Sequence, residues 1–272
     1  METVLVVKAL IMGLVEGVTE FLPISSTGHL ILTGEWLGFL DKEVRGVFEI
    51  FIQLGAILAI CWEYRTKLLG TLFGLGRDSG ARVFASNVAL AFCPAVVLGL
   101  TLGAKIKASL FSPLPVSTAF VVGGIIILAV ERRQHTPEID DVDAMGWQDA
   151  LKVGLAQCFA LIPGTSRSGA TIIGGLLFGL SRKAATEFSF FLAIPTLTGA
   201  AFYDLYKNWA LLDSSHLEYF ALGFFAAFVS ALFAIRGLLR YISNHDFTVF
   251  AWYRIAFGIL ILTMSFSGFL RW

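Results

Sequence analysis

Six stretches of this sequence are long and apolar enough to cross a lipid bilayer, and they constrain the fold more than any other feature. A helix needs about 20 apolar residues to cross about 30 Å of hydrocarbon. The stretches cover residues 46–64, 83–104, 108–130, 184–204, 217–238 and 247–270. With 57% hydrophobic residues and a mean hydropathy of +0.78, the composition is typical of a polytopic membrane protein. The expected fold class is all-α, in a single integral membrane domain over residues 1–272.

Charge and cysteine content exclude other classes of protein. Twenty basic residues balance 20 acidic ones, so no overall field favours nucleic acid as a partner. Cys61, Cys93 and Cys158 are isolated in apolar runs, which argues against a disulfide framework and favours helix packing. No charged segment with a cleavage site precedes the first apolar run, so we expect no cleaved signal peptide.

Two further apolar regions, 3–38 and 148–180, are interrupted in the middle by polar residues and helix breakers. The interruptions read L-P-I-S-S-T-G-H and I-P-G-T-S-R-S-G. A half-length helix cannot cross the bilayer, and irregular backbone at that depth must be buried in protein or line a cavity. Each region is therefore predicted to form a re-entrant hairpin of two short helices.

The two halves of the sequence resemble each other at an offset of 141 residues. Each half has one hairpin followed by three spans, so the second half starts on the opposite side of the membrane. We expect inverted repeats at 1–131 and 148–272, joined by a loop at 132–147, with hairpin tips that meet near residues 26 and 167. The offset places Gly13 on Gly154, Glu16 on Gln157, Ser25 on Ser166 and Gly28 on Gly169, and a three-residue change of register then places Glu49 on Glu187.

The distribution of lysine and arginine indicates the orientation. With the N-terminus outside, the cytoplasmic side collects twelve basic residues, Arg254 among them, against seven outside, with Arg167 taken as internal. Basic loops favour the cytoplasmic side. The N-terminus and the opening of the site are therefore expected on the periplasmic side.

Glu16 and Glu20 lie in membrane-grade sequence and are four residues apart, so on a helix they share a face. Two carboxylates at bilayer depth must face a protein interior or a wet cavity. They cannot both ionise cheaply there, so that one holds a proton or a cation bridges them. Two glutamates alone are a weak metal signal. A solvated or structural pair is the alternative.

The first tip also carries hydroxyl groups and a histidine. If a helix starts near Ser25 or Ser26, then Ser26 and His29 lie within one turn, a pairing that activates nucleophiles. Ser25 is expected to be an N-cap. For Ser26, a nucleophile and a phosphate-binding donor are both open, and Ser25 and Thr27 are further substrate-binding candidates.

The second tip has features that suit an oxyanion of phosphate type. Its backbone N–H groups are free at the first turn of a helix, and Arg167 lies among hydroxyl groups. An internal bridge from Arg167 to Glu16 or Glu20 is the alternative. Candidate substrate-binding residues here are Thr165, Ser166, Ser168 and Gly169.

Glu49 and Glu187 lie in the spans that follow the two hairpins. We expect both to hold the hairpin loops by accepting N–H or hydroxyl protons from them. Other charged residues at span ends, such as Glu131, are expected to be solvated.

The strings E-G-V-T-E-F-L-P-I-S-S-T-G-H and L-I-P-G-T-S-R-S-G-A-T closely resemble the two signature regions of the bacterial undecaprenyl-diphosphate phosphatases of the bacitracin-resistance type. The resemblance covers essentially the whole chain. It implies a bacterial inner-membrane enzyme that hydrolyses a C55 prenyl diphosphate to the monophosphate and inorganic phosphate, recycling the lipid carrier for peptidoglycan synthesis. It also implies dependence on a divalent cation.

The family motifs place functional residues at Glu16, Glu20, Ser26, His29 and Arg167. In the resulting hypothesis, Arg167 and helix N-termini hold the diphosphate, and Ser26 or a water attacks with His29 as base or acid. Glu16 and Glu20 orient His29 or hold Mg²⁺ or Ca²⁺. The prenyl tail lies in an apolar lateral groove.

Two rival classes share some of these features. Inverted repeats with broken helices also build secondary transporters, so a flippase of the prenyl phosphate is the alternative. A non-catalytic lipid scaffold is disfavoured, because it needs no buried Glu, Ser, His and Arg together. A monomer and a homodimer are both compatible with the sequence.

Replacing Arg167 by alanine is expected to nearly abolish turnover, because the anion loses its guanidinium partner. Phosphate release from a short prenyl diphosphate by the purified, correctly folded variant checks this. Substantial activity would refute the assignment of Arg167.

Overall fold

A computed structural model describes residues 2–133, 136–208 and 217–267, and these residues are helical almost throughout. Six helices have the length and composition of membrane spans, as the sequence predicted. They are α3 (Lys42–Glu63), α5 (Ser79–Leu110), α6 (Pro113–Glu131), α9 (Arg182–Lys207), α10 (Leu217–Ile242) and α11 (Thr248–Phe266). The protein is therefore a multi-pass membrane protein.

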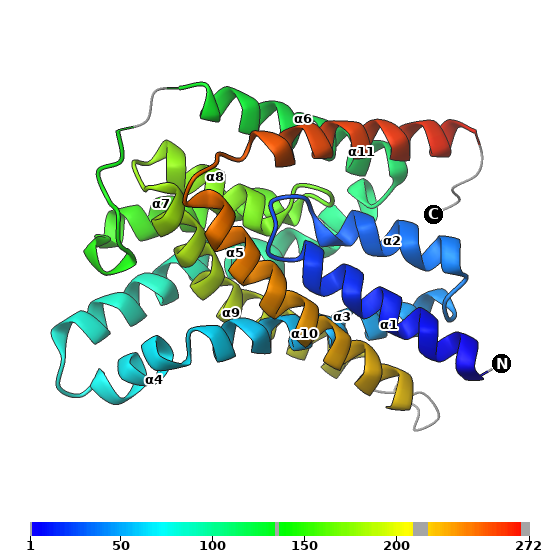
Figure 1. Cartoon of the computed structure of the whole chain (residues 1–272), viewed down its shortest axis with the longest axis horizontal. Coiled ribbons are helices and arrows are strands. Elements are labelled where there is room, and N and C mark those ends of the chain that lie inside the picture. The colour runs from blue at the N-terminus through cyan, green and yellow to red at the C-terminus, as the bar shows by residue number, and fades with distance from the viewer. Residues whose placement is uncertain (1, 134–135, 209–216, 268–272) are drawn as a thin grey trace.

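Two hairpins of shorter helices accompany the spans. The first consists of α1 (Glu2–Thr19) and α2 (Ser26–Leu37), which run antiparallel side by side in Figure 1. The second consists of α7 (Trp147–Gln157), the 3-10 turn η2 (Cys158–Leu161) and α8 (Arg167–Leu177). Both hairpins break where proline, glycine and serine were expected to end the helices.

Some boundaries differ from the prediction. The sequence pattern placed a break between residues 104 and 108, whereas α5 continues to Leu110 and α6 starts at Pro113. Exposed lysines do not end a helix, but a proline in the first turn fixes the start of the next one. The short helix α4 (Arg65–Gly74) was not predicted, and the predicted residues 268–270 of the last span lie outside the described part of the chain.

Backbone features recur at the offset of 141 residues. Ser25 and Ser166 precede α2 and α8 with φ of 68° and 71°, and Gly38 and Gly179 follow these helices with φ of 55° and 91°. A left-handed serine is strained. The recurrence of this strain at corresponding positions indicates that both hairpin tips have the same local design.

The helices pack in related pairs. The first hairpin helix α1 lies along α10, α7 lies along α5, and α6 and α11 run side by side along one edge of the molecule in Figure 1. Apolar side chains such as Val97, Leu100, Ile125 and Trp252 remain exposed on α5, α6 and α11. Exposed apolar faces of this extent are expected where lipid takes the place of water.

Polar contacts tie together the ends of the spans on one side. Glu131 at the end of α6 accepts hydrogen bonds from Arg182 at the start of α9 and from the backbone N–H of Phe247. Tyr64 donates to Glu187 at 3.4 Å, and Arg236 pairs with Glu63 at 2.8 Å. Contrary to the expectation of a solvated charge, the Glu131 side chain is only 4% exposed.

Gly13 and Gly154, related by the offset, lie against backbone of the neighbouring span. A Cβ on Gly13 would overlap the carbonyl oxygen of Gly223 in α10, and one on Gly154 would overlap that of Ala91 in α5. Both hairpins thus depend on a glycine for close helix contact.

Gly13→Ala is expected to destabilise the protein by about 1–3 kcal/mol through overpacking, seen as a lower Tm in detergent. Gly46→Ala is the control, because no atom lies within 4 Å of a Cβ there. An unchanged Tm for Gly13→Ala would contradict the close α1–α10 contact.

Candidate active site

The tips of the two hairpins meet through an ion pair. Nη2 of Arg167 lies 3.1 Å from Oε1 of Glu20, and the two side chains are 8% and 5% exposed. Ser168 Oγ also donates to the Leu22 carbonyl at 2.7 Å. The expected meeting of the tips near residues 26 and 167 is thus observed, across 147 residues of sequence between Glu20 and Arg167.

Local backbone geometry places the reactive side chains at the first residues of two helices. Ser26 begins α2 and Arg167 begins α8, each directly after a left-handed serine. Ser166 caps its helix by accepting from the Gly169 N–H at 3.0 Å, but Ser25 makes no side-chain cap bond. The expected N-cap role of Ser25 is therefore wrong, although Ser25 occupies the N-cap position.

Ser26 is bonded to Glu20. Its hydroxyl donates to Oε2 of Glu20 at 2.5 Å, while Arg167 contacts the other carboxylate oxygen. One carboxylate thus contacts both the hydroxyl of one hairpin and the guanidinium of the other. A hydroxyl beside a buried carboxylate has an acceptor for its proton.

His29 does not pair with Ser26, contrary to the expectation from their spacing. Its Nδ1 lies 2.7 Å from the Ser25 carbonyl, and its Nε2 lies 2.6 Å from the Tyr253 hydroxyl. A carbonyl only accepts, so Nδ1 carries the proton and Nε2 of the neutral ring accepts from Tyr253. The ring also stacks on Phe257, with centroids 4.1 Å apart.

Arg167 is held in place by α9. Its Nη1 donates to the carbonyl and to the hydroxyl of Ser189, at 3.0 and 3.2 Å, and its guanidinium lies over the Phe21 ring. Ser189 in turn shares a hydrogen bond of 2.7 Å with Thr171 on α8. Sequence reasoning missed Ser189, because a single serine in an apolar span carries no distinctive signal.

Glu49 and Glu187 do not contact the tips as expected. Glu49 lies 3.8 Å from Arg45 on its own helix, and Glu187 accepts from Tyr64. Other residues of the same two helices do reach the site: Gln53 of α3 lines the cavity described below, and Ser189 of α9 bonds to Arg167. The sequence therefore predicted the right spans but the wrong residues on them.

A cavity of about 210 Å³ lies between the tips. Its wall includes residues 160–164 and the apolar residues Ala95 and Leu197. Its polar lining consists of Glu20, Ser25, Ser26, Thr27, Gln53, Gln157, Ser166, Arg167 and Thr196. The cavity thus collects residues from both hairpins and from three spans.

The remaining predicted residues lie around this cavity rather than on its wall. Ser168 and the Gly169 N–H hold the second tip through Leu22 and Ser166, and the Thr165 N–H donates to the Ile162 carbonyl. These contacts build the loop. His29 and Glu16 are also absent from the cavity lining.

Glu16 is fully buried, and neither carboxylate oxygen has a hydrogen-bond partner among the described residues. A buried carboxylate without a partner calls for a proton or a cation. Over the same residues, no three His, Cys, Asp or Glu side chains cluster as metal ligands. Glu16 and Glu20 thus fit a cation only where a phosphate supplies further oxygen ligands, as is common for Mg²⁺.

Arg254 on α11 joins both tips to α6. This side chain is 1% exposed, and its guanidinium donates to the Pro23 and Gly164 carbonyls at 3.1 Å each. It also donates to Ala119 and Phe120 carbonyls, at 3.1 and 3.4 Å. Counting Arg254 among the cytoplasmic basic residues was therefore wrong. The signal that could have found it is a lone arginine in an apolar span.

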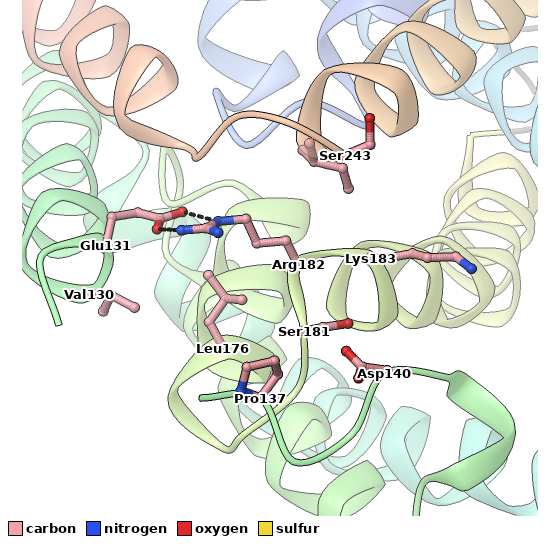
Figure 2. A pocket seen from close by; sticks show the side chains of 10 residues that line it. Val130, Glu131, Pro137, Asp140, Leu176, Ser181, Arg182, Lys183 and Ser243 are labelled. Carbon is pink, nitrogen blue, oxygen red and sulfur yellow. Dashed lines mark hydrogen bonds and ion pairs between the residues drawn. The ribbon is translucent and has the colours of Figure 1, made fainter. Parts of the chain in front are cut away.

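A second cavity, of about 440 Å³, lies at the end of the molecule where α6 and α9 are tied together. Figure 2 shows Arg182 extended toward Glu131, with Asp140, Ser181 and Lys183 on the neighbouring wall. None of the predicted site residues lines it.

The fold and the smaller cavity define a class: a multi-pass membrane protein with a buried hydroxyl, carboxylate and guanidinium in contact at one cavity. The chain belongs to the family described as bacitracin resistance protein BacA, whose model matches residues 9–260.

Curated relatives match the whole length of the chain. Undecaprenyl-diphosphatase 2 of Rhodospirillum rubrum is 66% identical over 272 residues, which is 100% of this chain and 99% of the relative. Undecaprenyl-diphosphatase of Nitrosospira multiformis is 60% identical with the same coverage. The protein of that name from Methylococcus capsulatus is 60% identical over 97% of each chain.

Arg254→Met is expected to leave four backbone carbonyls without their donor and to separate the tips. A lost donor to a buried acceptor costs about 1–3 kcal/mol, so we expect a lower Tm together with at least a tenfold loss of phosphate release. Arg240→Met, at an exposed position of α10, is the control. Full activity and an unchanged Tm in Arg254→Met would refute this role.

Proposed function

We propose that this protein is a membrane-embedded undecaprenyl-diphosphatase, which hydrolyses undecaprenyl diphosphate to undecaprenyl phosphate and inorganic phosphate. Relatives with that name match it over the full length. The observation that carries the proposal is the cluster of Ser26, Glu20 and Arg167 at one cavity. Such hydrolysis recycles the lipid carrier for cell-wall synthesis in the bacterial inner membrane.

In the proposed mechanism, Ser26 Oγ attacks the terminal phosphorus and Glu20 takes its proton. The P–O bond to the bridging oxygen breaks, and undecaprenyl phosphate leaves. Water then hydrolyses the phosphoserine, which releases inorganic phosphate and restores Ser26. Direct attack by a water bonded to Ser26 is the other route. The short Ser26–Glu20 hydrogen bond supports the first route, because the hydroxyl already has its base.

Arg167 and N–H groups in the first turns of α2 and α8 stabilise the negative charge that develops on phosphate oxygens. Ser189 fixes the guanidinium, so it needs no rearrangement during the reaction. Binding of the diphosphate also gives Arg167 a second anionic partner. Glu20 is then less tightly paired with Arg167 and can act as a base.

His29 is proposed to position Ser25 and the first turn of α2 rather than to act as the base. Both ring nitrogens are engaged, one with Ser25 and one with Tyr253. A base must reach the proton that it removes. Glu20 meets this requirement for Ser26, so the role first given to His29 passes to Glu20.

Mg²⁺ or Ca²⁺ is proposed as a cofactor, which Glu16 and Glu20 would hold and which would neutralise phosphate charge. Glu16 supports this assignment, because its two buried oxygens have no partner within the part of the chain that the structure describes.

The hairpins are proposed to be re-entrant, in inverted repeats at 1–131 and 148–272, with N-terminus and cavity opening on the periplasmic side. The left-handed serines and the paired glycines at the offset of 141 support the repeat. Without Arg254, eleven basic residues against seven still favour this orientation.

A flippase of the prenyl phosphate is the alternative function. The repeat pattern favours it equally, but transport requires no hydroxyl bonded to a carboxylate. The Ser26–Glu20 pair therefore favours hydrolysis.

Purified protein in detergent is expected to release inorganic phosphate from undecaprenyl diphosphate. Glu20→Gln should lower kcat by about 10²- to 10⁴-fold, the usual contribution of a general base, whereas His29→Gln should lose no more than about tenfold. No release by the wild type would reject the function. A folded His29→Gln variant as inactive as Glu20→Gln would return the base role to His29.

A further inference from the structure

The cavity between the tips contains a buried donor that the proposed mechanism does not use. Gln157, the last residue of α7, is 1% exposed and lines the cavity. Its Oε1 lies 3.2 Å from Thr196 Oγ1 on α9, a hydroxyl that also donates to the Leu192 carbonyl at 2.7 Å, but its Nε2 has no partner among the described residues. A buried amide N–H that stays unpaired is costly, and such groups require an explanation.

Only one other buried side-chain nitrogen within the described residues shares this condition, and it belongs to a residue that lines the same cavity. It is Nε of Arg167, whose terminal nitrogens are engaged with Glu20 and Ser189. Two unpaired N–H donors on residues that line one small cavity indicate a ligand rich in acceptor oxygens. The unpaired acceptors of Glu16 are not on that wall.

The charge balance of the cavity supports the same reading. Glu20 and Arg167 are the only charged residues in its lining, and they neutralise each other. A diphosphate that enters needs further donors, since one guanidinium does not satisfy all its oxygens. Neutral amide donors serve this need without binding anions indiscriminately.

The repeat explains why an amide is suitable here. The offset of 141 places Gln157 at the position that Glu16 occupies in the first half. A carboxylate at this wall would repel the diphosphate and leave no donor. The substitution of amide for carboxylate distinguishes the half that binds the anion from the half that supplies the base.

We infer that Gln157 is a substrate-binding residue, whose Nε2 donates a hydrogen bond to a phosphate oxygen of the prenyl diphosphate while Thr196 orients the amide. This inference rests on the proposed function. It assigns to the end of α7 a direct part in recognition of the diphosphate group.

The test compares Gln157→Met, which keeps the side-chain length without the donor, with Gln148→Met on the exposed face of the same helix. Loss of one hydrogen bond to a charged group is expected to lower kcat/KM by about 10- to 100-fold. The loss should appear mainly as a higher KM for undecaprenyl diphosphate, with an unchanged Tm. Gln148→Met should behave as wild type.

Gln157→Glu is the second variant, since it keeps the shape of the side chain and the acceptor for Thr196. In a Ser26→Ala background, its Kd for a non-hydrolysable prenyl diphosphonate should rise more than that of Gln157→Met. Unchanged kcat/KM in Gln157→Met, or unchanged Kd in Gln157→Glu, would overturn the inference about Gln157. The proposed function would still stand in that case, provided that the wild type hydrolyses undecaprenyl diphosphate. Absence of wild-type hydrolysis would overturn the function itself.

Discussion

The buried ion pair between Glu20 and Arg167 is the contact on which the rest of the site depends. It joins two hairpins that are far apart in the sequence, at a depth where neither charge has free access to water. Removing one partner of a buried pair typically destabilises a protein by about 3–5 kcal/mol, because the other charge is left uncompensated. The pair therefore ties the two tips together, and in the proposed mechanism it also supplies the base and the cation that meet the anion.

The neighbouring contacts make this arrangement rigid. Arg254 bonds to a carbonyl of each tip and to α6, and Ser189 fixes the arginine of the pair. Left-handed serines before α2 and α8 store strain that only such support can maintain. The site is preorganised by groups that never need to touch a substrate.

The two hairpin tips share backbone features but differ in chemistry. At the offset of 141, Ser26 corresponds to Arg167 and Glu16 to Gln157. In the proposed mechanism, the first tip thus supplies the reacting groups and the second tip binds the anion.

The sequence by itself determined the membrane class, the six spans, the two broken regions and most of the polar residues that line the cavity, because hydropathy and helix breakers act locally. Only the tertiary structure decided their partners. Spacing on α2 predicted a Ser26–His29 pair, but Tyr253 and the Ser25 carbonyl take both nitrogens of His29, and Glu20 takes Ser26. The roles of Arg254 and Ser189 also emerged only from the tertiary structure. A hydrogen bond between helices depends on how the helices pack, whereas sequence spacing indicates only which residues are neighbours on one helix.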